Sequence, residues 1–109
     1  MNIEELTCVS RIPLIGQITV SVIAIAIGYD FERKVILIIF YYDERKSIAD
    51  DEIMSEIASE IYTTALDSGY DIVDVVAEGV NANGKSYKAL NGLNGFLFAR
   101  YEPAKVKSA

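Results

Sequence analysis

The apolar positions between residues 47 and 69 follow the spacing of an amphipathic α-helix. They recur every three to four residues, which places them on one face of a helix with about 3.6 residues per turn. Ser47 or Asp50 can cap the first turn, and Gly69 suits the left-handed conformation that commonly ends a helix. We therefore predict one long helix with a buried stripe, formed by Ile53, Met54, Ile57, Ala58, Ile61, Tyr62, Ala65 and Leu66.

Two runs rich in β-branched and aromatic residues precede this helix and predict a pair of strands. The first run covers residues 17–27 and the second covers residues 34–42, and the connection at 28–33 has the Gly and Asp residues of a hairpin turn. The second run is apolar on both faces, which is typical of a central strand. In the first run Ala24 and Ala26 share a face, and their small side chains favour close approach by a helix.

The start of the chain predicts a short helix. Residues 3 to about 11 have helical spacing, with Glu4 and Glu5 in the first turn, where the helix dipole favours acids. Proline disfavours a helical conformation at the residue before it, so we expect the helix to stop at Pro13.

The last forty residues predict two strands separated by a long connection. Residues 70–80 form the first strand, with one apolar face and one mixed, solvated face; residues 96–102 form the second, and residues 104–109 a frayed tail. The connection at 79–95 holds four glycines and four asparagines. Within it, Asn83-Gly84 favours a type I′ turn followed by a short returning strand.

The order α-β-β-α-β-β predicts an α+β domain with two layers. We expect a mainly antiparallel sheet of about four strands, made of a first hairpin and a later antiparallel pair, with the long helix and the short N-terminal helix packed on it. The 109 residues fit a single domain, 1–109. Charged residues at 30–34 divide the most apolar region into runs that are shorter than the ~20 residues of a membrane span.

The charge is concentrated in one part of the chain. The whole sequence has a net charge of −6, but residues 43–78 contain 11 of the 16 acids and only two of the ten bases. Nucleic-acid binding favours the opposite sign, so we predict no nucleic-acid partner. The start lacks the basic and apolar segments of a signal peptide and there is one cysteine, which together predict a cytoplasmic protein.

Several kinds of chemistry have no support in the sequence. Histidine is absent, so the commonest general base and nitrogen metal ligand are missing. The acids at 50–52 lack the ligand spacing of a calcium loop, and no phosphate-binding glycine motif occurs. Cys8 lies in the predicted N-terminal helix near Leu6 and Val9, which favours a buried, inert thiol. We therefore predict no enzymatic activity, no metal and no cofactor.

The acidic residues and tyrosines of this region predict a surface for a protein partner. Glu52, Glu56 and Glu60 form a ladder at four-residue spacing, and such acids usually only keep a helix face solvated. The acidity continues into the next strand, however, and tyrosine is enriched in protein interfaces. The predicted electrostatic set is Glu52, Glu56, Glu60, Asp67, Asp71, Asp74 and Glu78, with Tyr62 and Tyr70 as anchors.

Four segments carry a resemblance to a known class of proteins. They are RIPLIGQIT at 11–19, GYDFERKVILIIFYYD at 28–43, the acidic helix, and FLFARYE at 96–102. Together they resemble small bacterial immunity proteins of polymorphic and contact-dependent growth inhibition toxin systems (CdiI-like). The resemblance implies a protein that neutralises a cognate toxin, often a basic nuclease, and that has no catalytic residues.

Two other functions remain open from the sequence. The 79–95 connection is compatible with a small ligand-binding or enzymatic α+β domain, because long loops of this kind often carry function. The apolar sheet is also compatible with a homodimer or a larger homo-oligomeric structural domain.

Overall fold

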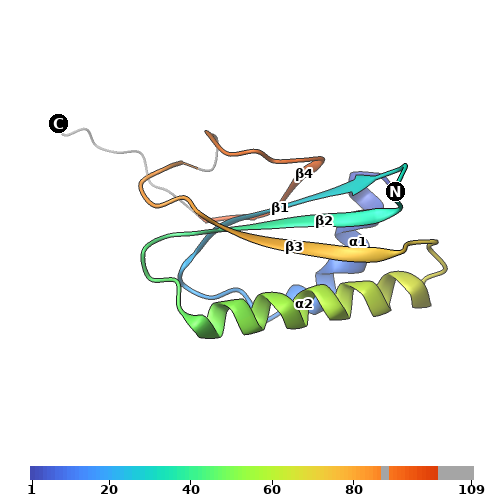
Figure 1. The fold of residues 1–109 in the computed structure, drawn as a ribbon, viewed down its shortest axis with the longest axis horizontal. Helices are drawn as coiled ribbons and strands as arrows, with labels where there is room; N and C mark the ends of the chain where they lie inside the picture. The colour runs from blue at the N-terminus through green and yellow to red at the C-terminus, as the bar shows by residue number, and fades with distance from the viewer. Residues whose placement is uncertain (87–88, 101–109) are drawn as a thin grey trace.

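A computed structural model describes residues 1–86 and 89–100, and it confirms the α+β fold and the predicted order of elements. Two helices and one four-stranded sheet form two layers (Figure 1). The elements are α1 (Ile3–Leu14), β1 (Val22–Asp30), β2 (Val35–Tyr42), α2 (Ile48–Asp67), β3 (Asp74–Asn81) and β4 (Gly95–Ala99).

The sheet has the strand order β3-β2-β1-β4, and it is mixed rather than wholly antiparallel. β1 pairs antiparallel with β2 and with β4, whereas β2 and β3 run parallel. The 20-residue helix α2 connects β2 to β3 and carries the chain back, so the strand after it runs in the direction of the strand before it. The predicted later antiparallel pair is therefore wrong, because β3 and β4 lie on opposite edges of the sheet.

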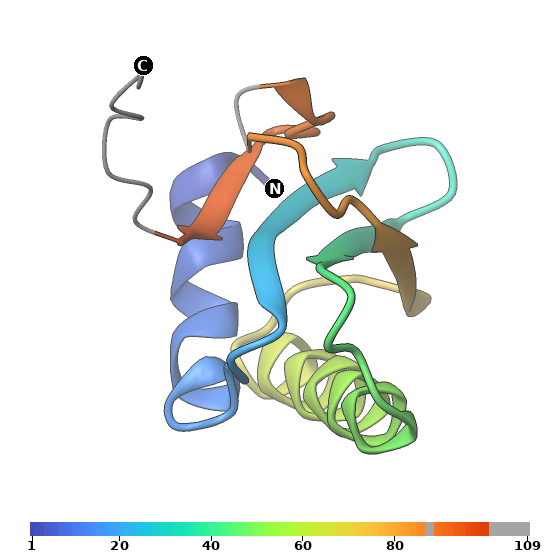
Figure 2. The ribbon, with the colours of Figure 1, turned by 90° about the vertical axis from the view of Figure 1, so that its left-hand side faces the viewer.

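The main core lies between the sheet and both helices (Figure 2). Along β2, alternate residues Ile36, Ile38, Phe40 and Tyr42 point into it, as the two-residue period of a strand requires. α2 covers them with its predicted stripe, in which Ile57, Ile61 and Ala65 have no exposed surface. The amphipathic pattern of residues 47–69 is thus explained by packing against the sheet.

The other face of the sheet is covered in part by the connection between β3 and β4. Ala24 and Ala26 pack there with Ile23, Tyr41 and Ala82 rather than against a helix, so the predicted helix contact is wrong. The larger Ile25 and Ile27 take the face toward the helices instead. A bulge leaves Ile23 as an extra residue between Val22 and Ala24, so Val22 joins the helix side while Ile23 shares the face of the two alanines.

Close contacts show that this connection lies directly on β1. A Cβ atom on Gly28 would be 2.7 Å from Asn94 Oδ1 and 3.0 Å from Leu93 Cβ, so a larger residue has no room there. The Asn94 amide donates to the Ile27 carbonyl at 3.0 Å, and the Tyr41 hydroxyl donates to the Asn91 carbonyl at 2.8 Å. The glycine- and asparagine-rich segment therefore covers part of the second face of the sheet, which gives it a structural role.

The predicted strand and helix ends differ from the structure in three places before α2. β1 continues to Asp30, so the connection to β2 covers residues 31–34 rather than the predicted 28–33. α1 continues through Pro13 to Leu14. Pro13 has no N–H to donate to the preceding turn, which costs the helix one hydrogen bond, but Pro13 and Leu14 are both buried, and this packing favours the helical end. β1 begins at Val22 rather than at residue 17, because the residues before it turn toward the start of α2.

Two more differences lie after β3. Asn83-Gly84 forms a turn, but Gly84 has a positive φ and Asn83 does not, which excludes type I′. Ser86, Ala89 and Leu90 are not in a strand; residues 87–88, part of that predicted strand, and the predicted tail at 104–109 are outside the described residues.

Tyr41→Phe tests the contact that fastens the connection to the sheet. We expect a loss of about 0.5–1.5 kcal/mol in the free energy of unfolding, because one hydrogen bond disappears while the ring still fills its site. Urea denaturation measures the loss, and faster amide exchange over residues 89–94 should accompany it. Tyr29→Phe on the same strand pair is the matched control, and an equal loss in both variants would contradict this role for Tyr41.

Candidate partner-binding surface

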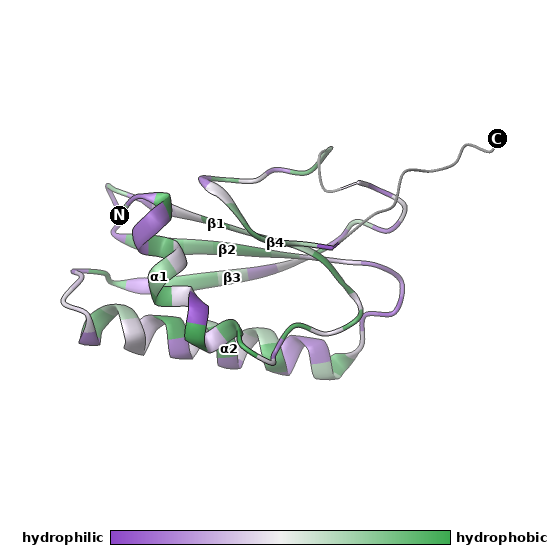
Figure 3. Ribbon diagram, turned by 180° about the vertical axis from the view of Figure 1, so that it is seen from behind, coloured by the Kyte–Doolittle hydropathy of each residue, from purple (hydrophilic) through white to green (hydrophobic). Residues whose placement is uncertain are grey.

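The acidic ladder of α2 faces outward, away from the sheet. Glu52, Glu56 and Glu60 are exposed, and Figure 3 shows polar segments recurring along the helix. Within the described residues, no Lys or Arg forms an ion pair with any of the three. Like charges four residues apart on a helix cost about 0.2–0.5 kcal/mol per pair, so the ladder lowers the stability of α2 slightly.

The acids that follow the helix have different surroundings. Asp67 is exposed at the end of α2. Asp71 is also exposed, but it forms an ion pair with Lys34 at 2.7 Å. The hydrogen bond and the charge of Asp71 raise the pKa of Lys34. Part of the charge of Asp71 is therefore compensated within the protein.

Asp74 and Glu78 lie on the opposite face of the sheet from α2. Val75 belongs to the core beside the helices, so its neighbours Asp74 and Val76 point to the other face, together with Glu78. Tyr41 lies on that face too, and its pKa is raised first by burial and further by the charge of Glu78. The structure thus separates the predicted electrostatic set into a helix group and a sheet group.

The two predicted anchors are half-buried rather than free. Tyr62 packs against the main core from α2. Tyr70 also packs against this core, and its pKa is raised by burial first and then by the nearby Glu5 carboxylate of α1. Both tyrosines contribute to the contacts that hold the two helices on the sheet, and their part in partner binding stays a prediction.

Asp43, which sequence reasoning did not single out, holds the ends of several strands together. Only 7% of its side chain is exposed, and its carboxylate accepts hydrogen bonds from Arg45 at 2.7 Å and Arg100 at 2.9 Å. Both arginines also donate to the Val20 carbonyl, at 2.9 and 3.2 Å. Arg45 chiefly, and then Arg100, hold the pKa of Asp43 well below its ordinary value although burial alone would raise it. Only the three-dimensional fold reveals this cluster, because Arg100 lies 57 residues from Asp43.

Asp50 is a second acid with a structural role. Its carboxylate accepts hydrogen bonds from the Thr19 and Ser21 hydroxyls, each at 2.8 Å, and from the Ser47 amide at 2.8 Å. Burial alone would raise the pKa of Asp50, but these hydrogen bonds outweigh burial and lower it. Asp50 therefore caps α2 and joins it to the segment before β1.

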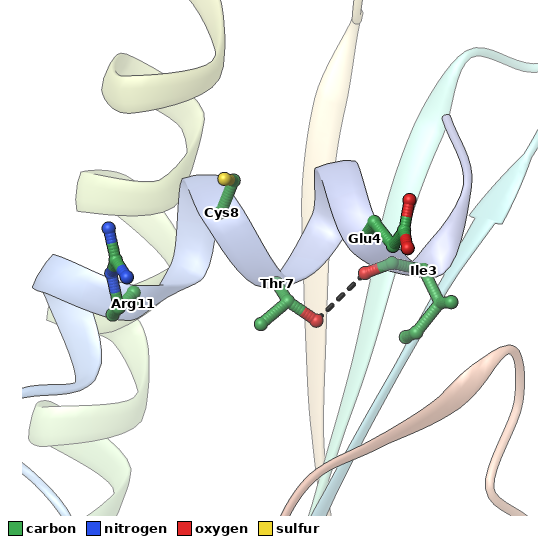
Figure 4. Close-up of a pocket in the computed structure, with 5 residues that line it drawn as sticks. All are labelled: Ile3, Glu4, Thr7, Cys8 and Arg11. Carbon is green, nitrogen blue, oxygen red and sulfur yellow. Dashed lines mark hydrogen bonds between the residues drawn. The ribbon is translucent and has the colours of Figure 1, made fainter.

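The outer face of α1 carries a shallow pocket lined by Ile3, Glu4, Thr7, Cys8 and Arg11 (Figure 4). The Thr7 hydroxyl donates to the Ile3 carbonyl at 2.8 Å, so it serves the helix. Cys8 is exposed, and the expectation of a buried thiol is wrong, because Leu6 and Val9 point into the core while Cys8 lies on the outer side of the turn.

The described residues show neither a metal-binding group nor a membrane-spanning helix. No three His, Cys, Asp or Glu side chains among residues 1–86 and 89–100 gather closely enough to hold a metal ion. In the same residues, no helix has the length and apolar content that crossing a membrane requires.

Comparison with protein families identifies the class. A family model described as MafI2 immunity protein matches residues 3–102, which include every helix and strand of the structure. The chain belongs to the MafI2 immunity protein family. No curated protein sequence gives a significant match.

Membership of the MafI2 family confirms the coarser part of the sequence-based prediction. It supports an immunity function against a toxin, and hence a cognate toxin as partner. The family also favours a non-enzymatic inhibitor. The match names MafI2 and not a contact-dependent growth inhibition system, so the CdiI-like assignment is not confirmed.

Asp43→Asn tests the cluster that the buried Asp43 carboxylate forms with Arg45 and Arg100. We expect a loss of about 2–3 kcal/mol in the free energy of unfolding at pH 7, because a charged acceptor for two guanidinium groups is removed. The pKa of Asp43 is lowered in the folded state, so its stabilising effect is present above the unfolded-state pKa of about 3.9 and is lost as the pH falls toward the folded-state value. The difference between variant and parent should therefore shrink below pH 4.

Urea denaturation at a series of pH values measures this difference. The matched control is Asp67→Asn, which removes an exposed carboxylate that has no ion-pair partner in the described part of the chain and should change the stability by less than about 0.5 kcal/mol. A pH-independent loss in Asp43→Asn would show that the ion pairs do not stabilise the fold.

Proposed function

We propose that this protein neutralises its cognate toxin by binding the toxin domain stoichiometrically through acidic surfaces. The toxin domain is basic and of the nuclease type, and the immunity protein covers the surface that receives the nucleic acid. The complex forms in the cytoplasm, and the inhibitor uses no catalytic residue, cofactor or metal.

The unpaired glutamate ladder on α2 is the observation that carries this proposal. Three carboxylates are exposed on one helix, they have no ion-pair partner among the described residues, and they repel one another. Packing and capping do not require them, since Asp50 caps the helix and the apolar stripe holds it. A basic partner would give them a function, because opposite charge speeds encounter between two proteins.

The alternative in which the 79–95 connection forms a ligand site has less support. Leu93 and Asn94 lie against β1, and Tyr41 is hydrogen-bonded to the Asn91 carbonyl, so these contacts are used to cover the sheet. We therefore prefer the toxin-binding function.

A charge reversal on α2 tests the proposal. The double substitution Glu56→Lys and Glu60→Lys should lower the association rate with the cognate toxin domain about tenfold or more at low salt, because it replaces attraction by repulsion. The difference should diminish as salt rises, because exposed charges are screened. Stopped-flow or surface plasmon resonance measurements over a salt series give the rates.

The matched control reverses two other exposed acids, Glu32 and Glu44, which are not in a helix. It changes the net charge by the same amount and should slow association less. The α2 variant should fold normally, since both positions are exposed. A lysine at position 56 attracts Glu52, and the repulsion between the two lysines only replaces that between the two glutamates. Equal rates for the parent and the α2 variant would exclude α2 as the steering surface, and failure of the parent to bind the toxin would exclude the function itself.

A further inference from the structure

β3 forms one edge of the sheet, and in the described part of the chain no strand pairs with its outer side. It is eight residues long and continuous in its register with β2. Edge strands of this kind present unpaired backbone N–H and C=O groups, onto which another strand can add. β3 therefore offers a ready site for one more strand.

Two apolar side chains at this edge are exposed to solvent. Val76 is 42% exposed in the middle of β3, and Val73, just before the strand, is 64% exposed. Asp74 and Glu78 flank Val76 on the same sheet face and have no ion-pair partner among the described residues. The result is an apolar centre between two negative charges that have no ion-pair partner in the part of the chain that the structure describes.

The charges of Asp74 and Glu78 distinguish two strands that could pair with this edge, one from a second copy of the protein and one from a basic partner. If a second copy paired antiparallel about Val76, Asp74 of each copy would lie opposite Glu78 of the other, and like charges directly opposite are destabilising. A strand with basic residues at the two facing positions would instead form opposite-charge pairs. Charge complementarity therefore favours a basic strand over self-association.

We propose that the free edge of β3 binds a β-strand of the toxin domain, which adds to the sheet as a fifth strand. The added strand carries Lys or Arg at two positions four residues apart, facing Asp74 and Glu78, with an apolar residue between them facing Val76. This inference rests on the proposed toxin-binding function and assigns the docking site within it.

The two acidic groups then have separate kinetic roles. The glutamates of α2 lie on the other side of the sheet from Asp74 and Glu78, so they act at long range and change mainly the association rate. The β3 edge makes the direct contacts and changes mainly the dissociation rate.

Amide hydrogen exchange of the parent protein tests the docking site without any substitution. Adding the cognate toxin domain should slow exchange at least about tenfold for the outward-facing amides of 74–81, because these amides gain hydrogen-bond partners in the complex. β4, at the opposite edge, should not change. A concentration series of the immunity protein alone tests for a second copy at the same edge.

Neutralising both acids tests the charge pairing. Asp74→Asn with Glu78→Gln keeps the shape of both side chains and should raise the dissociation constant about 2- to 30-fold, mostly through faster dissociation. Glu32→Gln with Glu44→Gln removes the same charge elsewhere and should leave the dissociation rate unchanged.

The outcomes separate this inference from the function on which it rests. A tight complex in which exchange over 74–81 is unchanged would overturn the docking site while leaving the immunity function intact. Protection of 74–81 that grows with concentration in the absence of toxin would overturn it in favour of self-association. Absence of any complex would overturn the proposed function.

Discussion

The fold depends on one constraint: β2 is apolar on both faces, and both faces must be covered. One face receives the stripe of α2 and part of α1, and this arrangement forms the main core. The other face is covered only in part, by the connection that ends in β4. Leu37 and Ile39 on that face stay partly exposed, and the open area continues onto Val76 at the edge. The part of this sheet face that stays exposed is thus the part that the β3–β4 connection does not cover.

The two-residue period of a strand explains why the acidic residues do not form one patch. Val75 must point into the core, which directs Asp74 and Glu78 to the face away from α2. The helix has its own constraint, because its buried stripe leaves Glu52, Glu56 and Glu60 on the outside. The glutamates of α2 and the acids of β3 therefore lie on opposite sides of the sheet.

The sequence predicts elements well where a local pattern decides them. α2 was expected at 47–69 and covers Ile48–Asp67, and β2 was expected at 34–42 and covers Val35–Tyr42, since periodicity and capping residues act locally. The bulge at Ile23 and the parallel pairing of β3 depend on neighbours far along the chain, so no local pattern reveals them. For the site, the sequence shows where the acids are along the chain but not which of them are exposed. Asp43 has the sequence context of an ordinary loop residue, and its partner Arg100 lies 57 residues away, so only the fold shows their contact.

This distinction changes the meaning of the acidic composition. Among the 11 acids of residues 43–78, Asp43 and Asp50 are buried in hydrogen-bond networks, and Asp51 and Asp71 are paired with Lys46 and Lys34. The acids without an ion-pair partner in the described residues are Glu44, Glu52, Glu56, Glu60, Asp67, Asp74 and Glu78. All of them except Glu44 lie in α2 or β3. The acids without an ion-pair partner in the described residues are therefore concentrated on the edge strand β3 and on the helix α2 that precedes it. Since neither packing nor capping requires these charges, binding of a basic partner is the function that best accounts for their position.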